Sequence, residues 1–103
     1  MARDVGELFR QRPPQWGLRG DPHVWDRIAR ILRGESLPQT EAELRTMIAA
    51  AFVQATGRDM DSGDRFAVDG LPKDGLSGGM VSARAWRETI LPFVLGQFRA
   101  LRD

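Results

Sequence analysis

Cysteine and tyrosine are absent from this chain of 103 residues, and histidine occurs once, as His23. Without cysteine the chain has no disulfide, thiolate nucleophile, zinc finger or iron–sulfur site. With one histidine and no tyrosine, few side chains can exchange protons near pH 7. The composition therefore offers little to acid–base or nucleophilic catalysis, and we expect no catalytic residues.

The chain also lacks long apolar runs and a strong charge of one sign. Its longest apolar stretch, residues 47–53, is far shorter than the roughly 20 residues of a membrane helix. No apolar signal region follows the charged first residues, so we expect a cytoplasmic protein without a membrane partner. Fifteen basic residues stand against 14 acidic ones, a formal net charge of +1. A nucleic-acid partner is therefore not expected, because it needs a concentrated positive field.

What the chain does contain is enough apolar material for a core. The hydrophobic share is 42% and the charged share 28%, at a length typical of one domain. We therefore expect residues 1–103 to form a single compact domain. Its predicted class is α+β, mainly helical, with three to four helices and a small two-stranded β element between the third helix and the last.

Two helices are predicted in the first third of the chain. Apolar residues at helical spacing indicate a short helix over residues 4–11 and a second over residues 22–33. Asp21 is the predicted N-cap of the second helix, and Pro22 fits its first position, where no N–H is needed. Gly34 follows as a terminator.

The third helix has the clearest start signal. Thr40 and Glu43 form a capping box, in which each side chain accepts from the other's exposed backbone N–H, and Gly57 ends the helix. Beyond it, partial alternation over residues 65–69 predicts a short strand. Residues 80–81 are either its partner strand or the lead-in to the last helix.

The last helix is predicted to open at Ser82 or Ala83. Pro92 interrupts it, which predicts either a kink or two abutting helices that break near Leu91. The expected inner face is Trp86, Ile90, Phe93, Val94 and Leu101.

The loop before the second helix is the first candidate binding segment. Trp16 and Arg19 are residue types enriched at binding hot spots, and here they lie on a short loop with glycines. The structural alternative is that Trp16 caps the core while Arg19 pairs with Asp21 or another acid.

The second candidate segment is rich in glycine and leads into the last helix. Backbone N–H groups around Gly78, Gly79 and Ser82 would suit an anion, with Arg19, Lys73 or Arg84 supplying charge. The spacing matches neither the phosphate loop nor the dinucleotide fingerprint. The structural alternative is that these glycines only permit a tight crossing under the helix.

No metal site or cofactor is expected. The aspartate-rich stretch 59–64 suggests a calcium loop, which needs a glycine at loop position 6 and a bidentate acid at position 12. Counted from Asp59, Gly63 stands at position 5, Asp64 at position 6 and Gly70 at position 12, so both required residues are missing. Turn formation explains these residues better. His23 has no nucleophile or orienting partner at a meaningful spacing, so we expect it to face solvent or bond locally.

Two segments of the chain together resemble a group of small, uncharacterised bacterial proteins of similar length. They are W-G-L-R-G-D-P at residues 16–22 and S-G-G-M-V-S at residues 77–82, the latter followed by Trp86. The resemblance covers nearly the whole chain. It implies no activity and no catalytic residue, but it favours a joint surface made by the two glycine-containing loops.

These observations favour a non-enzymatic protein-interaction module of a bacterial cytoplasm. The candidate binding residues are Trp16, Leu18, Arg19, Asp21, Gly78, Gly79, Met80 and Ser82. The alternative is a phosphate- or nucleotide-binding domain, or a small enzyme, that uses the glycine-rich turn. A third hypothesis, nucleic-acid binding by the stripe of Arg27, Arg30 and Arg33, is disfavoured by the nearly neutral charge. The sequence does not decide between a monomer and a homodimer.

Overall fold

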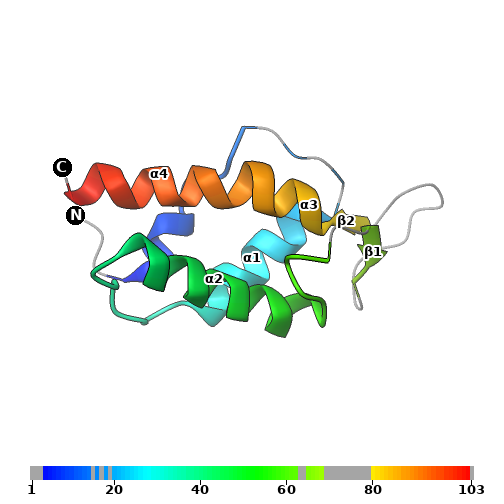
Figure 1. Ribbon diagram of the computed structural model, residues 1–103, viewed down its shortest axis with the longest axis horizontal. Coiled ribbons are helices and arrows are strands. Elements are labelled where there is room, and N and C mark those ends of the chain that lie inside the picture. Colours follow the sequence, from blue (N-terminus) through cyan, green and yellow to red (C-terminus); the bar gives the residue numbers. More distant parts are fainter. Residues whose placement is uncertain are drawn as a thin grey trace.

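Apolar residues at helical spacing form the long helices, and their inner faces meet in one hydrophobic cluster. The computed structural model describes residues 4–14, 16, 18, 20–62, 65–68 and 80–102. In chain order the elements are η1 (Val5–Phe9), α1 (Asp21–Ile31), α2 (Glu41–Thr56), β1 (Arg65–Ala67), β2 (Met80–Ser82), α3 (Ala83–Ala85), η2 (Trp86–Ile90) and α4 (Leu91–Arg102). Figure 1 shows α2 and α4 along the length of the molecule, with the two strands near one end. The predicted mainly helical α+β class is confirmed.

The first element is a 3-10 helix of five residues, shorter than the helix predicted over residues 4–11. Asp4 caps it, since one carboxylate oxygen accepts the N–H of Glu7 at 2.9 Å. The other oxygen accepts the N–H of Gly34 at 3.1 Å. Asp4 therefore fastens η1 to the chain just after α1.

Helix α1 begins differently from the prediction. Gly20 is its N-cap and makes no side-chain cap bond, while Asp21 is the first helical residue, so the predicted N-cap role of Asp21 is wrong. Its carboxylate instead bonds to partners outside the helix, as described below. At the other end α1 stops at Ile31, two residues before the predicted end, and Gly34 adopts a left-handed φ of 83°.

Helix α2 begins and ends at the predicted residues, but only half of the predicted capping box forms, because the Glu43 carboxylate accepts from the Thr40 hydroxyl at 3.2 Å and not from its backbone N–H. The Thr40 hydroxyl accepts the Glu43 N–H at 3.1 Å, and Gly57 closes the helix with a φ of 74°. At the start of the helix, Glu41 also meets the guanidinium of Arg99 from α4, with Arg99 Nη2 3.0 Å from Glu41 Oε2. The hydrogen bond to Glu41, followed by its negative charge, raises the pKa of Arg99 above its ordinary value.

Replacing Thr40 by alanine is expected to lower the free energy of unfolding by about 1 kcal/mol, because a helix N–H loses its acceptor. Urea denaturation followed by circular dichroism measures this change. Thr46→Ala is the control, because the Thr46 hydroxyl only donates to the Ala42 carbonyl inside the same helix. Equal losses for both variants would contradict the capping role.

The two strands pair antiparallel, which decides the alternative left open for residues 80–81. Arg65 lies opposite Ser82, Phe66 opposite Val81 and Ala67 opposite Met80. Phe66 and Val81 are both buried, so the sheet presents one pair of apolar side chains to the core.

The last helix runs through Pro92 without a break. Ser82 caps it by accepting the N–H of Ala85 at 3.2 Å. A π segment, η2, comes next, in which Leu91 donates its N–H to the Trp86 carbonyl. This wider turn immediately precedes Pro92. Proline has no backbone N–H to donate, so an ordinary α-helical turn at this position would lack one of its hydrogen bonds. Figure 1 accordingly shows one continuous rod from α3 to α4, so the alternative of two abutting helices is wrong.

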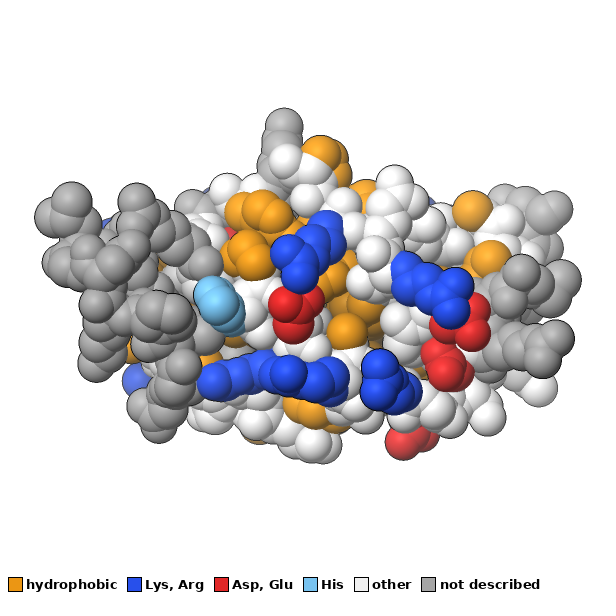
Figure 2. All heavy atoms as spheres, turned by 180° about the vertical axis from the view of Figure 1, so that it is seen from behind, with side chains coloured by type: hydrophobic (Ala, Val, Ile, Leu, Met, Phe, Trp, Pro, Cys, Tyr) orange, Lys and Arg blue, Asp and Glu red, His pale blue; other side chains and the backbone are white. Residues whose placement is uncertain are grey.

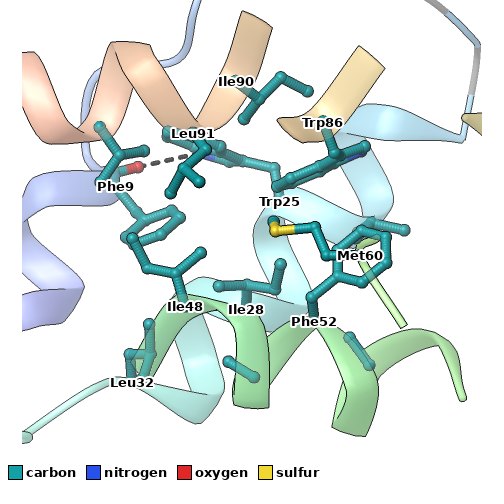
Figure 3. Packing of buried hydrophobic residues seen from close by; sticks show 14 of the residues in the cluster. Phe9, Trp25, Ile28, Leu32, Ile48, Phe52, Met60, Trp86, Ile90 and Leu91 are labelled. Carbon is teal, nitrogen blue, oxygen red and sulfur yellow. Dashed lines mark hydrogen bonds between the residues drawn. The ribbon is translucent and has the colours of Figure 1, made fainter. Parts of the chain in front are cut away.

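Aromatic rings from six elements lie in the core, and Trp25 of α1 packs among them (Figure 3). Its ring centroid lies 4.5 Å from that of Phe9, 6.4 Å from Trp86 and 6.2 Å from Phe93. Its indole N–H donates to the Phe9 carbonyl at 3.0 Å. One prediction for the inner face fails, because Leu101 is 38% exposed near the end of the chain.

Candidate functional site

The loop before α1 and strand β2 meet, although 60 residues separate them in the chain. The backbone N–H of Gly20 donates to the carbonyl of Met80 at 3.2 Å. This bond brings the start of α1, with Asp21, beside the strand that carries Met80 and Ser82, and a hydrogen bond to Asp21 holds Leu18 close by. The remaining candidate residues, Arg19, Gly78 and Gly79, lie outside the described residues.

Asp21 is the anchor of this region. Its side chain is fully buried. One carboxylate oxygen accepts the Trp86 indole N–H at 3.0 Å, and the other accepts the Leu18 backbone N–H at 2.9 Å. A buried carboxylate needs such donors, because desolvation otherwise makes its charge costly. Asp21 therefore joins the loop to the last helix, a structural role.

Trp16 and Leu18 are both half-buried. The Trp16 ring meets Trp25 edge-on, with ring centroids 5.9 Å apart. It therefore covers part of the core, as the structural alternative for Trp16 expects. Part of each side chain remains accessible, and Met80 is likewise half-buried. We call Trp16, Leu18 and Met80 the loop patch.

Of the three cations predicted to serve the glycine-rich turn, Arg84 alone lies within the described residues, and it is already engaged. Arg84 donates its Nε–H to both carboxylate oxygens of Glu88, at 3.2 and 3.3 Å. The Ser82 hydroxyl accepts a helix N–H, so it acts as a cap in this structure. Lys73 and residues 75–79 lie outside the described residues.

The residues proposed for metal or proton chemistry form ordinary local structure. Asp59 accepts the Asp61 N–H at 2.9 Å, which is a turn of the predicted kind. His23 is exposed on α1. Within the described ranges, no three metal-ligating side chains come together.

Sequence reasoning missed a group of arginines from two elements. Arg10 follows η1, Arg30 lies in the last turn of α1 and Arg33 lies just after that helix, and all three line one hollow of about 300 Å³. Arg27, included in the predicted stripe, is set apart because its guanidinium donates to the Ala55 carbonyl at the end of α2, at 3.2 Å. Figure 2 shows basic side chains in a row across one face. A sequence signal was missing because the docking of η1 on α1 creates the group.

Within the described part of the chain, no helix has the length and apolar character needed to cross a membrane. Comparisons with protein-family models, with curated proteins and with solved structures found no match to this chain, so the resemblance drawn from its two loop segments stays a prediction.

Proposed function

We propose that this protein is a non-enzymatic interaction module of a bacterial cytoplasm, and that it binds a protein partner through the loop patch. The observation that carries the proposal is the way in which the loop is held. Hydrogen bonds from Leu18, Gly20 and Trp86 fasten the loop and the start of α1 to β2 and the last helix, while Trp16 and Leu18 keep accessible apolar surface.

Backbone groups that are already held, as those of Leu18 and Gly20 are, suit recognition because binding then orders fewer new degrees of freedom. Flexible loops lose conformational entropy when a partner immobilises them, which weakens affinity. Tryptophan adds a large rigid contact surface and is frequent at the energetic centre of interfaces. The edge-on contact with Trp25 packs one side of the Trp16 ring against the core.

Leu18→Ser is expected to reduce partner binding at least about tenfold, because one apolar anchor of the patch is removed. The measurement is quantitative affinity capture from a bacterial lysate, followed by titration of the purified partner by isothermal calorimetry. Leu18 is preferred to Trp16, whose removal would also uncover Trp25.

Val53→Ser is the matched control, since Val53 is an apolar residue of α2 that is 45% exposed and lies outside the patch. It should leave binding unchanged. Equal affinity for the wild type and Leu18→Ser would refute the patch. Size-exclusion chromatography of the wild type tests whether the partner is a second copy of this chain.

A further inference from the structure

A hollow lined by charged side chains lies at the opposite end of α1 from the loop patch. It has a volume of about 300 Å³ and opens between η1 and the last turn of α1. The two elements approach closely there, since a Cβ atom on Gly6 would lie only 3.1 Å from the Cα of Arg33. This crossing brings the end of η1, with Arg10, to the same hollow as Arg30 and Arg33.

The three arginines are exposed, and none has an acidic partner within the described residues. By contrast, Arg12, Arg84 and Arg99 are each paired with an acid. The hollow sets three guanidinium charges against the carboxylates of Asp4 and Glu7, so its net charge is positive and favours an anion.

Two acidic side chains line the same hollow, and they differ in what they can do. Asp4 has both oxygens occupied by backbone N–H groups, those of Glu7 and Gly34. The Glu7 carboxylate has no partner within the described residues, so it can accept a hydrogen bond from a ligand. The lining thus combines three charged donors with one free acceptor.

The partial negative charge at the end of α1 gives Arg30 and Arg33 a second favourable interaction. That effect fades within the last turn of a helix. Arg10 is likewise the C-cap of η1, but a helix of five residues sums few peptide dipoles, so the effect is weaker there. The helix dipole also gives no explanation for the hollow between η1 and α1.

We propose that this hollow binds a small phosphate monoester that carries hydroxyl groups, the chemistry of a sugar phosphate. The guanidinium groups of Arg10, Arg30 and Arg33 donate charge-assisted hydrogen bonds to the phosphate oxygens. Glu7 accepts from a hydroxyl group of the same ligand. A volume near 300 Å³ is at the lower end for small-molecule sites and is too small for a nucleic-acid duplex.

The test is a titration of the full chain, followed by amide-resolved NMR at low salt, with ribose 5-phosphate, inorganic phosphate, ribose and a DNA duplex as separate probes. We expect saturable shifts around Gly6 and Arg33 with ribose 5-phosphate, weaker binding of inorganic phosphate, and none with ribose. Shifts confined to the DNA arm would overturn the proposal in favour of backbone binding. Absence of saturable shifts with both phosphate probes would overturn it altogether.

Arg30→Gln and Arg33→Gln should each weaken ribose 5-phosphate binding about tenfold, which is the loss of one charge-assisted bond. Arg45→Gln is the matched control, because Arg45 is an exposed arginine of α2 outside the hollow. An equal weakening by Arg45→Gln would show that the effect comes from the net charge of the protein, and it would contradict the site.

Glu7→Gln separates the two halves of the proposed ligand. It should tighten inorganic phosphate, because a repelling charge is removed, and should weaken ribose 5-phosphate relative to phosphate, because the amide is a poorer acceptor for a hydroxyl. Equal tightening of both probes would contradict the assignment of the hydroxyl contact to Glu7.

Discussion

Replacing Trp25 by alanine is expected to lower the free energy of unfolding by about 4 kcal/mol. The side chain is 1% exposed and touches the rings of Phe9, Trp16, Trp86 and Phe93. Its removal leaves a cavity and also leaves the Phe9 carbonyl without its donor. Because a domain of this size is stable by only about 5–15 kcal/mol, this one change removes a large share.

Urea denaturation measures the effect, with circular dichroism as the signal so that loss of a tryptophan does not disturb it. Val53→Ala is the control, since Val53 is 45% exposed and its truncation should change stability by less than about 0.5 kcal/mol. A loss below about 2 kcal/mol for Trp25→Ala would contradict the central place of this ring in the core.

Asp21→Ala is expected to cost about 3 kcal/mol, because the buried Trp86 indole N–H and the Leu18 backbone N–H lose their acceptor together. Asp21→Asn should cost less, since an amide keeps one acceptor oxygen but turns its NH₂ group toward one of the two donors. The measurement is urea denaturation, together with the NMR signal of the Trp86 indole proton, which should shift in both variants.

Asp26→Ala is the matched control for Asp21, because both acids belong to α1. Asp26 pairs with Arg12 at the surface, at 3.0 Å, and its side chain is 48% exposed. Such a pair contributes less than about 1 kcal/mol. Similar losses for the two variants, or an unmoved indole signal in Asp21→Ala, would show that the buried carboxylate does not anchor the loop.

Local signals in the sequence were sufficient for the bounds of α2 and for the start of the last helix. The bounds of α2 followed from Thr40 and Gly57, because a side-chain N-cap and a left-handed glycine act on backbone groups a few residues away. The last helix was predicted to open at Ser82 or Ala83, and Ser82 is its N-cap. The pairing of β1 with β2 was predicted as one alternative, and the hydrogen bonds across the strands decide it.

Features that depend on distant partners were mispredicted or missed. Asp21 was expected to cap α1, but its carboxylate bonds to Trp86, 65 residues further along the chain. Pro92 was expected to kink or split the helix, and the split is wrong, because the preceding π segment carries the helix through it. The role of Asp21 has no local signal, since its partner comes from a distant part of the chain.

The candidate sites likewise have features that the sequence predicted and features that only the packing of the elements creates. From the sequence alone, the two loop segments were identified as unusual, because tryptophan and glycine in short loops stand out from helical periodicity. The sequence by itself also determined the mainly helical class, since helix capping and the spacing of apolar side chains are set by residues close together in the chain. Only the tertiary structure decided that Gly20 meets Met80 and that Arg10 joins Arg30 and Arg33 around one hollow. The physical reason is that these contacts arise when the elements pack on the shared core, which no short stretch of sequence specifies.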